Sequence, residues 1–454
     1  MKDATDLAAN IAAGKLSAVQ AMQASLAATE RFSDLGAIAR LEPGMGTAAA
    51  QAFDQSEDKG DLPFGGVPFL AKDLGGYSAG LGPVAGSPAL ARVSKDPEED
   101  DDLFKGFRAM GLLPFGLTTV PEFGLALSCE PPGVPPALNP FDRSYSPGGS
   151  SGGAAAAVAA GIVSIAHATD AAGSTRVPAA CCGLVGLKAT RGRVPGAPHF
   201  NNHLMGIASE FVLTRSVRDA ITAFEAIKLG NAEPGAAIRS VGICVPGTAS
   251  AATGQRMSEL REALEGMGVA VNDLTPPDAI GSRAMELAGA IFAASLASWL
   301  DSVSVDPSDI TPICAALYER GKAMPAQDLF EVHTDLVRLS HEGTRLFDTI
   351  DTLIMPVLAD GPPKVGFFDP NQTDPGARYA QMSAVAPNVA LANVAGLPGL
   401  AMPFGMLPEP RAHLPFGFQM MGPHGSDEAL FELAAQIEAI APKITYPHPL
   451  AGAS

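Results

Sequence analysis

The chain has 454 residues, of which 47% are hydrophobic and 17% are charged, and its formal net charge is −18. This length and apolar content suffice for a sizeable core, whereas the acidic balance would repel a phosphate backbone, so we expect no nucleic-acid partner. The five cysteines lack C-x-x-C spacing and the longest apolar runs end before about 18 residues, so we expect a cytoplasmic protein with neither a disulfide framework nor a membrane segment.

The first part of the chain combines helical patterns with short apolar strands. Apolar residues at helical spacing predict two amphipathic helices within residues 3–32, and Ser17 is placed to cap the second. The stretch 62–76 predicts a short strand that delivers Lys72 into a glycine-rich turn. Residues 97–124 predict a helix with an acidic first turn followed by a buried strand, which is an α/β unit.

The rest of the chain continues the alternation of helices and strands. Residues 154–195 predict a helix of small residues, a strand around 162–168 and a turn rich in Ala, Gly and Ser, and helices alternate with short strands from 205 to 360. The Pro- and Gly-rich segment 361–377 is interpreted as a surface loop, because a strand and a helix pattern follow at 400–440. We therefore predict one α/β domain over 1–454, with N-terminal helices in 1–60, a core in 61–220 and a helix-rich remainder with the substrate pocket in 221–454.

A Gly/Ser loop precedes the helix of small residues. Gly148 to Gly152 satisfies G-x-S-x-G with Ser150 at its centre, which is the pattern of a nucleophile elbow. An elbow needs a buried strand directly before the serine, whereas the preceding residues are polar and include Pro140 and Pro147, so this interpretation is disfavoured. For the loop alone, a flexible Gly/Ser turn that enters a closely packed helix remains the alternative.

A second serine lies in another turn of small residues. The sequence TDAAGSTRVPAA contains Ser174, with Asp170 and Arg176 on either side as an ion pair that can fix the shape of the turn. A serine hydroxyl attacks weakly unless a base takes its proton, and no nearby histidine has an obvious triad context.

Lys72 is the candidate base. A lysine can accept a proton when burial lowers its pKa, as in Ser-Lys variants of the catalytic triad. Protons would then pass between Lys72 and Ser150, and between Ser150 and Ser174. The alternative is a surface lysine paired with Asp73.

These pieces together resemble the amidase signature family over nearly the whole chain. The segments that carry the resemblance are GVPFLAKDL around Lys72, TTVPEFG at 118–124, NPFDRSYSPGGSSGG at 139–153, TDAAGSTRVPAACCGLVGLKATRGRVP at 169–195, TRSVRDA at 214–220, and the late ANVAGLPGLAMPFGMLP and LPFGFQMMGP. The resemblance implies an α/β fold in a single large domain, with a central mixed twisted β-sheet covered by helices on both faces.

The resemblance also implies a cofactor-free amidase that hydrolyses the C–N bond of a small, neutral or apolar carboxamide. In the implied mechanism Ser174 forms the acyl-enzyme, Ser150 is the bridging serine, usually held by a cis peptide bond, and Lys72 is the base. The other implied roles are an oxyanion hole from the backbone N–H groups of Ala171, Ala172, Gly173 and Ser174, substrate contacts at Gly124 and Leu125, and structural support from Asp170, Arg176 and Ser151. Cys314 is a further candidate for the pocket, with a buried packing cysteine as the alternative.

The chain departs from the family pattern in places. Many members read D-T-G-G-S or D-N-G-G-S where this chain has DAAGS, so Ala172 occupies a usual glycine position, and His167 and Ala168 replace a common Leu-Gly. An alanine there keeps its N–H donor, but a positive φ would cost roughly 1–2 kcal/mol. The run AHATDAAGSTR is similar to the subgroup that includes 6-aminohexanoate cyclic dimer hydrolases.

Several alternatives remain open. One is an amidotransferase subunit that supplies ammonia to misacylated tRNA, and another is a cyclic amide hydrolase. Many members of the family are homodimers, so a homodimer is possible here, with a small-molecule amide as substrate. His199 and His203 have an H-x-x-x-H spacing but lack a regular helical pattern and a glutamate base, so we expect no metal site.

Overall fold

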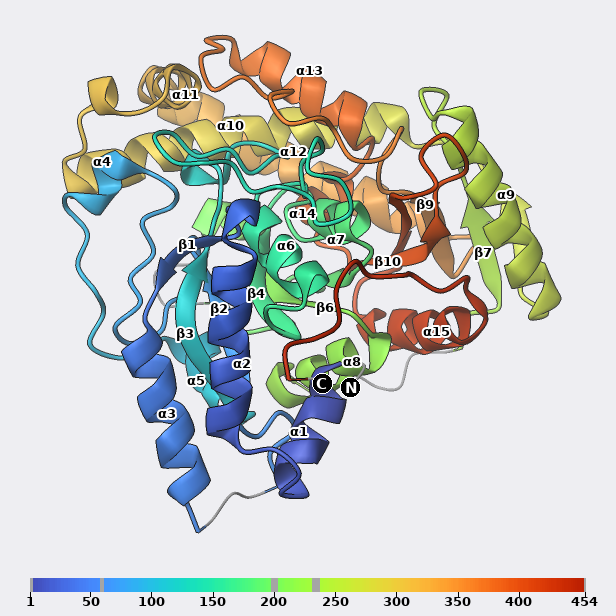
Figure 1. Ribbon diagram of the computed structural model, residues 1–454. Helices are drawn as coiled ribbons and strands as arrows, with labels where there is room; N and C mark the ends of the chain where they lie inside the picture. The colour runs from blue at the N-terminus through green and yellow to red at the C-terminus, as the bar shows by residue number, and fades with distance from the viewer. Residues whose placement is uncertain (1–2, 58–60, 197–202, 231–236, 453–454) are drawn as a thin grey trace.

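The computed structural model describes residues 3–57, 61–196, 203–230 and 237–452, which contain a mixed sheet of eleven strands (Figure 1). Its strands run in the order β1-β3-β2-β4-β6-β5-β10-β11-β9-β7-β8. Strand β2 is parallel to β3 and β4, whereas β4 is antiparallel to β6. The bounds are β1 Ile38–Leu41, β2 Val67–Lys72, β3 Leu112–Thr118, β4 Ile165–Asp170, β5 Val185–Lys188, β6 Ser209–Thr214, β7 Ser240–Ile243, β8 Ala270–Asp273, β9 Thr352–Pro356, β10 Gly399–Met406 and β11 Pro415–Met421.

Fifteen α-helices surround the sheet in the described residues. They are α1 Ala4–Ala12, α2 Ala18–Arg31, α3 Pro43–Gln55, α4 Pro88–Ala91, α5 Asp102–Ala109, α6 Gly152–Ala160, α7 Arg176–Cys182, α8 Val217–Ile227, α9 Ala251–Gly266, α10 Asp278–Val303, α11 Pro312–Lys322, α12 Ala326–Thr344, α13 Pro375–Val385, α14 Leu391–Ala395 and α15 Asp427–Ile440. The predicted pair of N-terminal helices is present, and Ser17 caps α2 in a capping box with Gln20. Figure 1 shows α10 to α13 gathered along one side of the molecule, with α1, α8 and α15 on the other.

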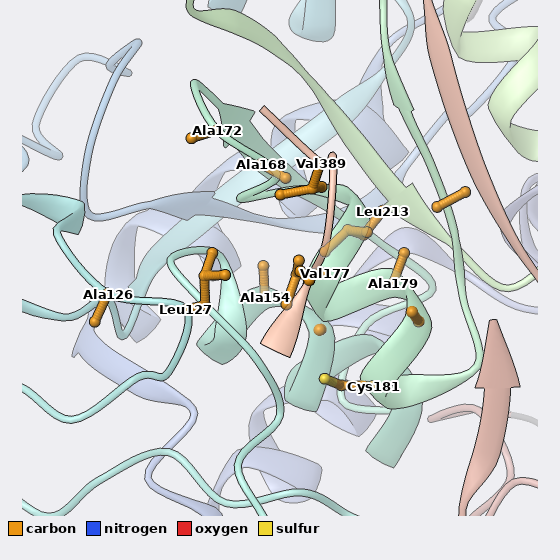
Figure 2. Packing of buried hydrophobic residues seen from close by; sticks show 14 of the residues in the cluster. Ala126, Leu127, Ala154, Ala168, Ala172, Val177, Ala179, Cys181, Leu213 and Val389 are labelled. Atoms are coloured by element: carbon orange, nitrogen blue, oxygen red, sulfur yellow. The ribbon is translucent and has the colours of Figure 1, made fainter. Parts of the chain in front are cut away.

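Helices cover both faces of the sheet. On β2, Leu70 belongs to a buried cluster shared with α6, α7 and α10, whereas its neighbour Phe69 belongs to a second cluster shared with α1, α5, α8 and α15. Because side chains alternate along a strand, the two clusters lie on opposite faces. Figure 2 shows part of the first cluster, including Ala154 from α6 and Val177 from α7. The predicted α/β architecture is confirmed.

Helix α6 packs closely because its residues are small. It consists of glycine, alanine and one valine, and every residue is buried. The N–H of Gly153 donates to the carbonyl of Thr119 at 3.1 Å, and a Cβ atom at Gly153 would lie 2.4 Å from the backbone nitrogen of Thr119. Glycine is therefore required at this contact. The contact anchors the helix directly after Ser150 and Ser151.

Helix α10 is the longest of the described helices, with 26 residues. By length and composition it could cross a membrane, but 56% of its most apolar window is buried inside the protein. Such burial is typical of a core helix in a large domain. One face of α10 also contributes to the site described below.

Candidate active site

Lys72 ends β2, and its side chain is fully buried. Its Nζ lies 2.8 Å from Ser150 Oγ and 2.6 Å from Thr169 Oγ1. Burial lowers the pKa of Lys72 to about 7, although nearby anionic groups act in the opposite direction. A lysine with this pKa is partly neutral at pH 7 and can accept a proton. The alternative of a surface pair with Asp73 is wrong, because the Asp73 carboxylate accepts instead from backbone amides of the loop 84–86.

Ser150 faces the lysine from the loop before α6. The peptide bond between Gly149 and Ser150 is cis, as the resemblance implies. Residues 139–151 form turns and loop rather than a strand, so the nucleophile-elbow interpretation lacks the strand that it requires. The loop therefore presents Ser150 to Lys72 and not to a histidine.

Ser151 joins the two serine loops. Its N–H donates to the carbonyl of Ser174 at 3.2 Å, and its Oγ donates to the carbonyl of Thr169 at 3.2 Å. The Ser150 and Ser174 hydroxyls line the same cavity, and no hydrogen bond joins them within the described residues. Catalytic hydrogen bonds often tighten only when substrate binds, so this geometry suits a relay that closes on the substrate.

A buried ion pair fixes the turn that carries Ser174. The Asp170 carboxylate accepts from Arg176 Nε at 2.9 Å and from the N–H of Gly173 at 2.7 Å. Burial alone raises the pKa of Asp170, but the guanidinium of Arg176 together with hydrogen bonds from Asn393 and Gly173 lowers this pKa to about 2. Asn393, which the sequence analysis missed, donates to the carbonyl of Asp170 at 2.9 Å and accepts from Arg176. The predicted ion pair is confirmed.

The substitution Asp170→Asn is expected to destabilise the protein by about 3–5 kcal/mol, because it leaves the guanidinium of Arg176 buried without a counter-charge. The matched control is Asp335→Asn, which breaks an exposed pair with Arg338 and should change stability by less than about 1 kcal/mol. Urea unfolding of both variants measures the difference. Equal effects would show that the buried pair contributes no more than a surface pair.

Three of the four residues predicted to form the oxyanion hole line the cavity. Ala171, Ala172 and Ser174 line it, and their N–H groups have no hydrogen-bond partner among the described residues. The prediction for Gly173 is wrong, because its φ of +104° turns the N–H toward Asp170. Ala172 lies outside the left-handed region, so the alanine that replaces a usual glycine imposes no backbone strain.

The cavity over the two serines is mainly apolar. Gly124 and Leu125 line it as predicted, and a Cβ atom at Gly124 would lie 3.3 Å from Ser150 Oγ. Trp299 on α10 packs edge-to-face against Phe123, with ring centroids 5.6 Å apart. Within the described part of the chain, no charged side chain lines this cavity.

Two predicted features do not join this cavity. Cys314 is buried in α11, with Sγ 3.8 Å from the carbonyl of Glu122, and it lines a separate cavity. Cys314 is therefore not among the residues that line the cavity over the two serines, and its burial supports a role in packing. His199 lies outside the described residues, and the side chain of His203 is likewise not described, so the H-x-x-x-H spacing stays untested.

Thr169 is a site residue that sequence reasoning missed. It precedes Asp170 on β4 and contacts Lys72 Nζ through its hydroxyl. Because β2 and β4 are parallel neighbours, their carboxyl ends meet at one edge of the sheet. His167 and Thr169 are two residues apart on β4 and therefore share one face of the strand. This pair of polar residues on one face was the sequence signal that could have identified Thr169.

Known proteins match this chain over almost its full length. The model of the Amidase family matches residues 20–234 and 240–431. The putative amidase AmiC of Mycobacterium tuberculosis H37Rv is 30% identical and covers 97% of this chain and 94% of its own. A 6-aminohexanoate-cyclic-dimer hydrolase of Paenarthrobacter ureafaciens is 28% identical, with 97% and 95% covered. A solved structure of 6-aminohexanoate cyclic dimer hydrolase has a TM-score of 0.88 at 26% identity, with 97% of both chains covered.

A third relative has a different named role. A glutamyl-tRNA(Gln) amidotransferase subunit of Chromohalobacter salexigens is 29% identical and covers 96% of both chains. The fold, the site and these matches define an α/β enzyme that hydrolyses amide bonds. The chain belongs to the amidase signature family.

Proposed function

We propose that the protein hydrolyses a small, uncharged carboxamide through an acyl-enzyme on Ser174. The observation that carries this proposal is the buried Lys72 Nζ, which lies 2.8 Å from Ser150 Oγ at the edge of the cavity that also holds Ser174. A fully buried lysine is costly to retain, and its lowered pKa suits a base that works near pH 7.

The proposed reaction has two halves. Ser174 Oγ attacks the amide carbonyl carbon while its proton passes to Ser150, and the Ser150 proton passes to the neutral amine of Lys72. The oxyanion accepts hydrogen bonds from the amides of Ala171, Ala172 and Ser174. The amine leaves with a proton returned along the relay. Water then attacks the ester of Ser174 with the same groups, which releases the carboxylic acid and restores the serine.

The lining of the cavity favours an apolar substrate. An ionised substrate group would lose its hydration there without meeting a counter-charge among the described residues. The side chains of Phe123, Phe292, Leu296 and Trp299 offer aromatic and aliphatic surface instead. The amide bond must lie at the polar end, where the two serines and the free backbone amides meet.

A panel of amides tests the substrate class. Neutral aryl and alkyl amides are expected to have kcat/KM at least about tenfold above matched amides that carry a carboxylate or an ammonium group. Trp299→Ala should lower kcat/KM for the apolar substrates by about 10-fold or more, because it removes a large part of the apolar wall. The control Phe330→Ala removes an aromatic side chain that is 72% exposed on α12 and should change little. A preference for charged amides would contradict the proposed substrate class.

Two alternatives within the family have specific support. The similarity to the cyclic dimer hydrolases supports a cyclic amide substrate, so the panel includes the 6-aminohexanoate cyclic dimer. The similarity to an amidotransferase subunit supports an ammonia-supplying role with partner subunits. Turnover of simple amides by the isolated chain would count against the second alternative. A homodimer and a cytoplasmic location belong to the same proposal, and five buried free cysteines support a reducing compartment.

A further inference from the structure

A buried polar pair lies directly behind Lys72. His167 on β4 accepts a hydrogen bond at Nδ1 from the backbone N–H of Lys72, at 3.3 Å. Its Nε2 lies 3.0 Å from Oε2 of Glu210 on β6. Both side chains are buried, at 0% and 2% exposure. Because Nδ1 accepts from a backbone amide, Nε2 is the ring nitrogen that carries hydrogen and donates to the Glu210 carboxylate.

The same carboxylate also holds the turn that follows the lysine. Glu210 Oε2 accepts from the N–H of Gly76 at 2.7 Å. A Cβ atom at Gly75 would lie 2.9 Å from this oxygen, and one at Gly76 would lie 3.0 Å from it. The Gly-Gly pair therefore lets the carboxylate reach the turn. The chain around Lys72 is thus fixed at the lysine by His167 and four residues later by Glu210.

Aromatic side chains shield the pair from water. The ring of Phe104 on α5 contacts the His167 ring edge-to-face at 5.2 Å, and the ring of Phe107 lies 5.9 Å away. Hydrogen bonds are stronger in such a low-dielectric setting, and their loss is not compensated by water. Glu210 also lies opposite Thr169 in the sheet, and Thr169 is the residue whose hydroxyl contacts Lys72 Nζ.

We propose that His167 and Glu210 are a coupled positioning pair that holds Lys72 in register with Ser150. The pair touches neither the substrate cavity's serines nor the reacting atoms, and it acts through the backbone on either side of the lysine. The inference rests on the proposed function, since it assigns these residues to the relay of Lys72, Ser150 and Ser174.

The electrostatics of the site predict how the pair influences the lysine. The groups whose charges raise the pKa of Lys72 against its burial are Cys129, Asp170, Glu210 and Asp73. Burial raises the pKa of the Cys129 thiol to about 12, so the thiol is neutral at pH 7 and the three carboxyl groups are the relevant charges. Removal of the Glu210 charge therefore favours the neutral amine and moves its titration to lower pH.

The test measures how fast a serine-directed sulfonyl fluoride labels Ser174, as a function of pH, in the full-length protein. The variants are Glu210→Gln, which keeps the shape of the side chain, His167→Leu, and the double variant. We expect Glu210→Gln to move the midpoint of the pH profile to lower pH and to slow labelling at the plateau by about fivefold, because a neutral amide accepts weaker hydrogen bonds from His167 and Gly76 than the carboxylate does. We expect His167→Leu to slow labelling by about tenfold or more across the profile, because a displacement near 1 Å can cost on the order of 100-fold.

Coupling and controls distinguish positioning from general stability. If the two residues act as one unit, the double variant should be no more than about twofold slower than the slower single variant. The control Asp219→Asn alters another buried carboxylate that accepts backbone N–H groups, at Ala4 and Thr5, and should lower the melting temperature without moving the pH profile. Rescue of the labelling rate by His167→Gln, which retains a donor and an acceptor, would support positioning.

Three results would overturn the inference. The first is that both single variants fold and label Ser174 at the wild-type rate and with the wild-type pH midpoint. The second is that the labelling rate of the double variant falls by the full product of the two single losses. The third is wild-type protein that neither labels at Ser174 nor turns over an amide, which would overturn the proposed function and this inference with it. If the wild type labels at Ser174 and the variants label at the same rate and with the same pH midpoint, only the positioning role of His167 and Glu210 is overturned.

Discussion

Ser174→Ala is expected to lower kcat/KM for the best amide substrate by at least about 10⁴-fold, because it removes the atom that we propose forms the acyl-enzyme. The fold should be unaffected, since the Ser174 side chain faces the cavity and the backbone contact to Ser151 remains. Steady-state kinetics with circular dichroism of the purified variant measures both quantities. The matched control is Ser164→Ala, which removes a buried hydroxyl that has no hydrogen-bond partner among the described residues. It should retain activity within about twofold.

Ser150→Ala separates the two serines. It interrupts the proposed relay but keeps the proposed nucleophile, so we expect a loss of about 10²- to 10⁴-fold, smaller than that of Ser174→Ala. A larger loss in Ser150→Ala than in Ser174→Ala would reverse the proposed roles. Normal activity in both variants would contradict the mechanism.

Lys72→Met is expected to lower kcat/KM by about 10³-fold or more and to remove the pH dependence of activity near neutrality, because the unbranched apolar side chain cannot accept a proton. In the native protein kcat/KM should rise about tenfold per pH unit below pH 7 and level off above it, as Lys72 with a pKa of about 7 becomes neutral. The control Lys188→Met replaces a second fully buried lysine with a pKa of about 7, whose Nζ donates to the carbonyl of Ala189. It should leave the pH profile unchanged.

The same lysine has a consequence for stability. Its folded-state pKa lies below the ordinary value of 10.5, so the unfolded chain binds more protons between about pH 7 and 10.5, and stability rises with pH across this window. The free-energy cost of burying the charged amine of Lys72 is therefore paid in full below about pH 7 and disappears above about pH 10.5. Lys72→Met should unfold at a higher urea concentration than the native protein at pH 6, with the difference shrinking toward pH 10. If Lys72→Met is inactive and also less stable than the native protein at pH 6, this result would contradict the claim that the buried lysine lowers stability and is retained for catalysis.

Local patterns predicted much of the site. An apolar strand that ends in Lys72, and two small-residue turns that hold Ser150 and Ser174, were visible in the sequence because strand ends and tight turns have strong residue preferences. The pair of Asp170 and Arg176 was predictable for the same reason, since both residues lie within one turn.

The remaining features depend on contacts between distant segments. Glu210 meets His167 because β4 lies between β2 and β6, and no local pattern specifies that strand order. The direction of the Gly173 amide depends on one positive φ value in a turn, and residue types alone do not distinguish an N–H that faces the cavity from one that faces Asp170. Cys314 was misplaced because the rotation of α11 about its axis decides which residues face the cavity.

The most direct test of the central claim is peptide mapping after treatment with a serine-directed sulfonyl fluoride, in the native protein and in Lys72→Met. We expect a single label on Ser174 in the native protein and its loss in the variant, because in the proposed mechanism the hydroxyl is activated only through Ser150 and Lys72. A label on Ser150, or undiminished labelling of Ser174 without the lysine, would contradict it.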